Sequence, residues 1–197
     1  LTGTSLGRLF RICVRMHHDE QSLVVDELAM QRGLLGRWLG GSSMRESELA
    51  VQALVVSAPI DTGHVLAVAI SVGAVHVWRL PVGTFAETQA PSFVMADMDL
   101  GKTIAARSLY LTGTRYSAAI AQHIQIIDGA YESTTNMLAL LVKDNSQSTA
   151  HFGIAVLPLQ PNMTAINVHQ WVTLQYEQAH DPRALAQPTL HLSQSRP

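Results

Sequence analysis

The stretch His64–Leu80, HVLAVAISVGAVHVWRL, decides the fold of this chain. It contains two short runs rich in Val, Ala and Ile, which are separated by Ser71–Gly73. In a β-strand successive side chains point to opposite faces, and in the first run both faces are apolar. A strand that is apolar on both faces is typical of a sheet packed between neighbouring sheets. The stretch therefore predicts a β-hairpin inside a stack of sheets.

Flanking runs extend this hairpin into a four-stranded unit. The pattern predicts strands at about 49–57, 64–70, 74–80 and 92–98, joined by short connections. Residues 81–91 are predicted to form a loop, because proline lacks the N–H group that a strand needs. A similar unit follows, with strand-like runs at 109–112, 116–121, 123–127, 136–143, 151–159 and 166–176 and polar turns at 129–135 and 144–149.

The N-terminal part predicts a further, incomplete unit. Polar and apolar residues alternate over residues 6–28, with a polar turn at 17–21, which indicates a second hairpin. Leu28, Leu35 and Trp38 then recur at helical spacing, and two glycines follow, so a short helix over 28–39 is expected. At the other end, residues 178–197 contain three prolines and no lasting period, which indicates an edge segment or linker.

Repeated four-stranded units are typical of a radially repeated fold. We predict an all-β fold: a divergent β-propeller fragment of about three four-stranded blades with a short helical insertion. The propeller part spans 1–177, with blades at approximately 6–48, 49–98 and 107–177, and residues 178–197 form the tail. No Trp-Asp pair marks the repeat, because Trp78 is followed by Arg79. A ring needs about 4–8 blades, so we expect the chain to belong to a larger protein.

Composition limits the function. The 197 residues are 47% apolar and 14% charged, which predicts a folded chain with few surface charges that packs against further protein. A net charge of −2 with dispersed Lys and Arg argues against direct nucleic-acid binding. Cys13 is the only cysteine, so the chain offers no internal disulfide and no cysteine-based zinc site, and a reducing cytosolic or nuclear compartment is expected. No transmembrane segment is expected, because no apolar run reaches the roughly 18 residues needed.

The middle of the chain resembles the N-terminal β-propeller of the 160 kDa nucleoporin of the Y-shaped outer-ring complex of the nuclear pore. The features that carry the resemblance are LLGRW (Leu34–Trp38), VHVWRL (Val75–Leu80), VMADM (Val94–Met98) and, in the following blade, LYLTGT, HIQIID, MLALLVK and HFGIAVLPL. It spans about 6–176 in outline and is most specific over 34–159. The resemblance implies a structural scaffold at the nuclear envelope that contacts other nucleoporins of the Y-shaped complex and supports nucleocytoplasmic transport and mRNA export.

Under this interpretation Leu34, Leu35 and Trp38 are candidate partner-binding or packing anchors, since buried apolar and aromatic side chains supply most of the affinity of an interface. The helix that carries them has an apolar face and few basic residues, so packing is favoured over weak contact with a membrane surface. Two other classes stay open: the propeller of a vesicle coat or trafficking complex, and a propeller enzyme or ligand-binding domain with a polar channel.

Several short motifs suggest chemistry, and each has a simpler interpretation. ADMDLGKT (Ala96–Thr103) resembles a phosphate-binding P-loop, but Ala96 replaces the first glycine, and we expect the next residues to return to a strand where a P-loop needs a helix. Lys102 is then solvated in a loop. The sequon Asn162–Thr164 is silent if the protein is nuclear or cytosolic.

The histidines likewise predict no active site. His17, His18, Asp19 and Glu20 are consecutive, so their side chains alternate between faces and indicate a polar turn rather than a metal site. Histidines 76, 151 and 169 fall in predicted strands without an assigned nucleophile or orienting carboxylate, and no GxSxG elbow occurs. We therefore expect no catalytic residue, no cofactor, no metal ion and no enzymatic activity.

Overall fold

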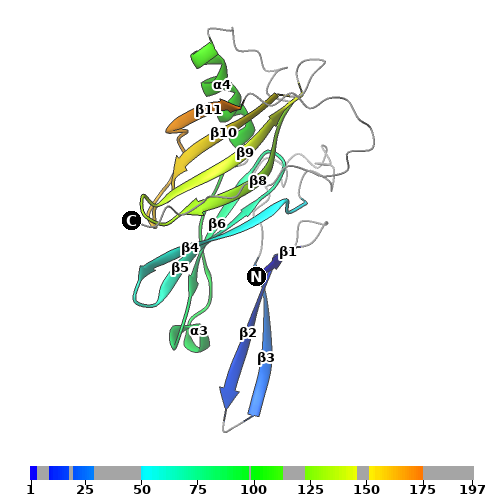
Figure 1. Ribbon diagram of the computed structural model, residues 1–197. Coiled ribbons are helices and arrows are strands. Elements are labelled where there is room, and N and C mark those ends of the chain that lie inside the picture. The colour runs from blue at the N-terminus through cyan, green and yellow to red at the C-terminus, as the bar shows by residue number, and fades with distance from the viewer. Residues whose placement is uncertain are drawn as a thin grey trace, which may run out of the picture.

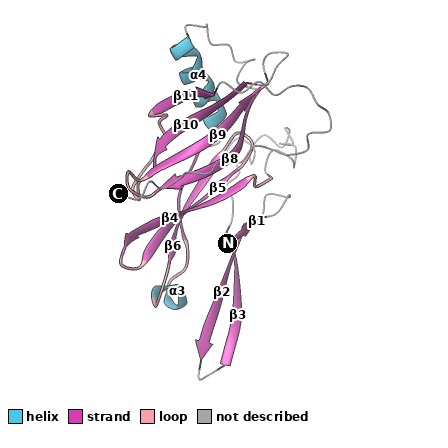
Figure 2. Ribbon diagram, viewed as in Figure 1, coloured by secondary structure: helices cyan, strands magenta, loops and turns pink. Residues whose placement is uncertain are grey.

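The computed structural model describes residues 1–3, 9–17, 20–28, 50–97, 99–112, 123–145 and 151–174. Most of these residues form β-strands (Figures 1 and 2). The N-terminal sheet contains β1 (Thr2–Gly3), β2 (Leu9–His17) and β3 (Glu20–Leu28). The central sheet contains β4 (Ala53–Asp61), β5 (His64–Ile70), β6 (Val75–Pro81) and β7 (Ser92–Asp97). The C-terminal sheet contains β8 (Ile124–Glu132), β9 (Met137–Asp144), β10 (His151–Pro158) and β11 (Gln170–Leu174).

The central and C-terminal sheets have the same simple topology. In each sheet, four antiparallel strands lie in the order in which they follow one another along the chain. The first strands of the two sheets, β4 and β8, contact each other. This is the arrangement of successive up-and-down units, and it confirms the predicted all-β fold built from four-stranded antiparallel blades. The N-terminal sheet has three strands among the described residues.

The largest apolar core lies between the central and C-terminal sheets. From the central sheet it takes one face of β5, with Leu66, Val68 and Ile70 each 0% exposed. From the C-terminal sheet it takes Leu138, Leu140 and Val142 of β9, together with Ile126, Ala155 and Leu157 of the neighbouring strands. Each such side chain contributes about 1.5–3 kcal/mol when it is removed from water. Sheet-on-sheet packing therefore joins these two blades.

The opposite face of the central sheet is also covered. Val65, Ala67 and Ala69 of β5 pack with Trp78 and Leu80 of β6, and the cluster includes Leu9 and Leu28 from the open end of the β2–β3 hairpin. Both faces of β5 are thus buried, as the alternation in His64–Leu80 predicted. Trp78 is 2% exposed, so its role here is packing. The two cores make the central sheet the middle layer of the described structure.

A helix occupies a segment for which a loop and a strand were predicted. The chain forms α4 over Leu100–Thr112, whereas the sequence had indicated a return to strand at 109–112. Leu100 and Ile104 are spaced four residues apart, so they lie on one face of a helix, and both are 0% exposed in the core between the two large sheets. The strand prediction was wrong because Leu100 and Ile104 can both reach the core between the two large sheets only when they lie on one face of a helix.

Other boundaries differ from the predictions in smaller ways. The predicted loop after β6 includes one helical turn, α3 (Phe85–Thr88). The predicted turn at 129–135 begins later, because β8 continues to Glu132 and the chain turns over residues 133–136, where Asn136 has a φ of 55°. β11 begins at Gln170, later than the predicted 166. β3 includes Leu28, where the helix was expected to start; the rest of that helix, the predicted strand at 116–121 and the tail lie outside the described residues.

Candidate interaction surface

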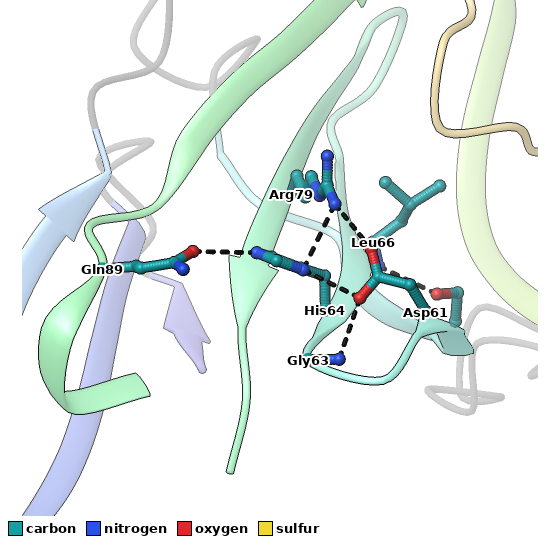
Figure 3. A network of polar contacts seen from close by, with 7 residues as sticks. Asp61, Gly63, His64, Leu66, Arg79 and Gln89 are labelled. Carbon is teal, nitrogen blue, oxygen red and sulfur yellow. Dashed lines mark hydrogen bonds and ion pairs between the residues drawn. The ribbon is translucent and has the colours of Figure 1, made fainter. Parts of the chain in front are cut away.

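A network of polar side chains fixes one end of the central sheet (Figure 3). Asp61 lies at the β4–β5 turn, where its Oδ1 accepts the backbone N–H of Gly63 at 2.8 Å. The same oxygen lies 2.8 Å from Nδ1 of His64, and Oδ2 accepts a hydrogen bond from Nη2 of Arg79 at 2.5 Å. Nε2 of His64 lies 3.0 Å from Oε1 of Gln89, which follows α3. The network therefore connects the turn, β6 and the segment after α3.

Antiparallel pairing brings these residues together. β5 and β6 pair with His64 opposite Pro81, so Arg79 lies two residues from the strand end and close to the turn. The ring of His64 stacks on Phe85 of α3, with centroids 5.9 Å apart and planes inclined by 26°. The hydrogen bond from Gly63, followed by those from His64 and Arg79, lowers the pKa of Asp61 to about 2. Asp61 is consequently an anion at neutral pH. Its two carboxylate oxygens bind the turn residue Gly63, His64 of β5 and Arg79 of β6.

These contacts link the β4–β5 turn to β6 and to the segment after α3. They do not form a catalytic triad, because no nucleophile among the described residues lies beside His64. Nε2 of His64 faces an amide oxygen rather than a hydroxyl or thiol nucleophile. Ser57, the nearby buried serine in β4, donates to the carbonyl of Ala58 at 2.6 Å and accepts the N–H of Leu66 at 2.8 Å. Both interactions are to backbone, so the hydroxyl completes the irregular pairing of β4 with β5.

The P-loop-like segment is built differently from a phosphate cradle. Ala96 and Asp97 belong to β7, and α4 begins at Leu100. The N–H of Gly101 donates to the carbonyl of Gly73 at 3.1 Å, and Lys102 forms an ion pair with Asp99, with Nζ and Oδ1 2.5 Å apart. The strand and helix that surround a P-loop are therefore present, in contrast to the prediction of a second strand. However, Lys102 is paired with a carboxylate, and the N–H of Gly101 donates to a backbone carbonyl, so neither group is available to a phosphate.

The remaining sequence motifs occupy varied positions. His17 and Glu20 pair at the far end of the β2–β3 hairpin, while His18 and Asp19 lie outside the described residues. His76 is 0% exposed and stacks on Trp78, with centroids 5.8 Å apart, whereas the histidines at 151 and 169 are exposed. Within the described ranges, no group of three or more His, Cys, Asp or Glu side chains could hold a metal ion. Asn162 is exposed in the turn at 161–162.

The predicted anchors cannot be placed, because Leu34, Leu35 and Trp38 lie outside the described residues. The described surface instead offers large apolar side chains that the sequence reasoning did not single out. Three of them, Ile12, Leu23 and Val25, lie on the β2–β3 hairpin and are 48%, 70% and 59% exposed. The others are dispersed: Leu1, Val56, Phe85, Phe93 and Val172. The signal for the hairpin was available, because Ile12, Leu23 and Val25 follow a period of two on paired strands.

No helix in the part of the chain that the structure describes is long and apolar enough to cross a membrane. The described helices are α3, with four residues, and α4, with thirteen.

The sequence matches no protein-family model and no curated protein. Among solved structures, it is similar to the β-propeller domain of Nup133 from Vanderwaltozyma polyspora, with a TM-score of 0.63 and 13% sequence identity. The match covers 88% of this chain and 42% of that chain, so the chain spans less than half the length of the solved domain. At this identity the likeness concerns the fold alone. The sheets described above are a fragment of a β-propeller fold.

Proposed function

We propose that this chain is part of a non-enzymatic scaffold β-propeller of the nuclear pore outer ring. The observation that carries the proposal is the likeness of its fold to the propeller domain of Nup133, which is a nucleoporin. The sequence resemblance to the propeller of the 160 kDa nucleoporin, a different protein, points to the same class of scaffold. One likeness lies in backbone geometry and the other in short sequence motifs. In this proposal the protein resides at the nuclear envelope, in the nuclear pore complex.

The described polar groups support a structural role. Asp61 forms hydrogen bonds with His64 and Arg79 at the β4–β5 turn. Arg11 is 6% exposed and pairs with Asp26 across the β2–β3 hairpin, with Nη2 and Oδ2 2.6 Å apart. Groups that are engaged in this way fix the shape of turns and strand ends. A scaffold needs such fixed geometry, because its function is to hold partners in defined positions.

Binding in this proposal depends on protein–protein contacts with other nucleoporins of the Y-shaped complex. Leu34, Leu35 and Trp38 remain the proposed anchors, since truncation of a central aromatic residue commonly costs an interface 2 kcal/mol or more, or about a thirtyfold loss of affinity. No cofactor or metal ion takes part. Nucleocytoplasmic transport and mRNA export would depend on the chain through the assembled pore.

The test is affinity purification of the tagged protein from cells at moderate salt, followed by mass spectrometry. Near-stoichiometric recovery of outer-ring nucleoporins supports the proposal. Recovery of vesicle-coat or trafficking subunits in their place assigns the chain to another scaffold, and absence of any stable partner would direct attention to a ligand-binding propeller. Trp38→Ala should reduce recovery, whereas the control Val172→Ala, at a side chain of β11 that is 40% exposed, should retain it, with circular dichroism used to check that both variants are folded.

A further inference from the structure

The segment that follows β6 lies on the surface of the central sheet. We refer to residues 83–90, which include α3, as the α3 segment. Among its described side chains only that of Ala86 is half-buried, and the rest are exposed. Two backbone hydrogen bonds lie within the segment, from Ala86 to Gly83 at 3.1 Å and from Gln89 to Phe85 at 2.9 Å. A segment with little buried apolar surface opens at a low cost in free energy, so its position depends on the side chains that hold it.

His64 of β5 meets the α3 segment at both ends of the helix. Its ring stacks on Phe85, the first residue of α3, with centroids 5.9 Å apart. Its Nε2 lies 3.0 Å from Oε1 of Gln89, the residue after α3 (Figure 3). The ring of Phe85 also lies against Gly63, where an added Cβ atom would overlap it. His64 therefore joins the α3 segment to the end of the central sheet.

The proton on Nε2 decides how strong the contact with Gln89 is. Nδ1 of His64 lies 2.8 Å from a carboxylate oxygen of Asp61, so Nδ1 carries a hydrogen atom. When Nε2 is also protonated, it donates to the amide oxygen of Gln89, and a hydrogen bond from a charged donor is about twice as strong as a neutral one. When Nε2 carries no proton, the amide has to turn and donate from its nitrogen, which gives the weaker, neutral bond.

Two charged side chains face the ring of His64 among the described residues. The carboxylate of Asp61, at the end of β4, attracts the proton on the ring. The guanidinium of Arg79, from β6, has its Nη2 3.2 Å from Nδ1 and repels that proton. The α3 segment places Phe85 and Gln89 at the ring, and both are uncharged. A change in the charge of the ring therefore reaches the segment through the hydrogen bond to Gln89.

We propose that His64 is a pH-sensitive latch, which holds the α3 segment more firmly when its ring is a cation. Histidine is the side chain whose charge ordinarily changes between about pH 5 and 8, so the latch responds in that range. Loosening moves Phe85, which is 39% exposed, away from Gly63 and uncovers the end of the central sheet. The inference uses contacts within the chain and does not depend on the nuclear pore assignment.

Hydrogen–deuterium exchange of the full-length protein at about pH 5.5 and about pH 8 tests the proposal. Amide protection over 82–90, corrected for the intrinsic exchange rate at each pH, should fall several-fold from the lower to the higher pH, with the buried strand β9 as the internal reference. Gln89→Leu, whose side chain forms no hydrogen bond, should abolish the fall. The control Thr88→Val, at an exposed side chain of the same helix, should retain it. Equal protection at both pH values in the wild type, or an undiminished fall in Gln89→Leu, would overturn the proposal.

Gln89→Glu separates the charge of the ring from the shape of the contact. A carboxylate only accepts hydrogen bonds, so at this position it binds the protonated ring and gains nothing from an unprotonated Nε2. We expect a larger fall in protection between the two pH values in Gln89→Glu than in the wild type. A fall equal to that of the wild type, or smaller, would contradict the proposal, because the segment would then be held independently of the charge on His64.

Discussion

Replacing Gly129 by alanine tests how closely the two large sheets pack. Gly129 lies in β8, at the interface with the central sheet. A Cβ atom at this position would overlap Cδ1 of Ile70 and lie 3.2 Å from Cδ2 of Leu140 and 3.5 Å from Cγ2 of Val55. Ile70 and Leu140 are both 0% exposed, so neither side chain can move into solvent. The added methyl group must therefore push the sheets apart or force a side chain from its preferred rotamer.

The expected magnitude follows from two opposing terms. Overpacking of a filled core costs about 1–3 kcal/mol. The lower conformational entropy of alanine in the unfolded chain returns about 0.4–1 kcal/mol. We expect a net loss of about 1–2 kcal/mol in the free energy of unfolding. For a chain of this size that loss corresponds to a decrease of about 2–8 °C in Tm, at roughly 2–4 °C per kcal/mol.

Gly63→Ala is the matched control, measured by the same thermal and urea unfolding experiments. A Cβ atom at Gly63 would overlap the ring of Phe85, but Phe85 is 39% exposed and can swing outward. Its cost should be clearly smaller than that of Gly129→Ala, and the loss of its stacking on His64 should be the main structural effect. An unchanged or higher Tm for Gly129→Ala, or an equal loss at both glycines, would refute the packing argument.

Three further predictions concern named contacts. Asp26→Ala removes the partner of Arg11, which is 6% exposed, and should lower the free energy of unfolding measured in urea by less than the about 3–5 kcal/mol of a fully buried pair, because the Asp26 side chain is 35% exposed. Ile104→Ala should cost about 2–5 kcal/mol in the same measurement, because α4 is part of the core. The hydroxyl of Thr135 and the backbone N–H groups of Thr134 and Thr135 donate to the carboxylate of Glu132 and lower its pKa from 4.5 to about 2, and the pKa of Asp61 is lowered from 3.8 to about 2. Both carboxylates should therefore stabilise the fold above about pH 5, and this contribution should be lost as the pH falls towards about 2. The loss of stability on acidification should be smaller in Asp61→Asn and Glu132→Gln.

The central hairpin was predictable because local pattern and tertiary position agree there. Residues 65–70 are apolar on both faces, and the structure buries every one of them between two neighbouring layers. The same agreement holds for β9, where Leu138–Val142 form an unbroken buried run. A strand that is covered on both faces is a nearly continuous apolar run, so its burial can be predicted from its composition.

The helix α4 could not be recognised in the same way. Thr103, Ile104 and Tyr110 favour strands, and only the four-residue spacing of Leu100 and Ile104 indicates a helix. The hydrogen bond from Gly101 to Gly73 and the burial of Ile104 between two sheets come from residues that are distant in sequence. Tertiary packing therefore outweighed local propensity. The turn predicted at 129–135 includes Gly129, which lies inside β8, because the close approach of Ile70 and Leu140 at this position requires a residue without a side chain.

The polar network was hidden from the sequence because its members come from separate segments. Asp61 and Arg79 are 18 residues apart, and His64 and Gln89 are 25 apart. Only the register of β5 with β6 and the position of α3 bring them together. The Asp-Thr-Gly-His sequence does signal a turn, but a turn motif does not specify a distant arginine.

The burial of the central sheet restricts where partners can bind. One face of this sheet packs on the C-terminal sheet and the other packs with Leu9 and Leu28, so among the described residues its interior faces are occupied. Among the described residues, this sheet exposes the Asp61 network and Phe85 at one end, Val56 of β4, which is 47% exposed, and Phe93 of the edge strand β7, which is 36% exposed. The exposed side chains of the β2–β3 hairpin, Ile12, Leu23 and Val25, are separate from these places.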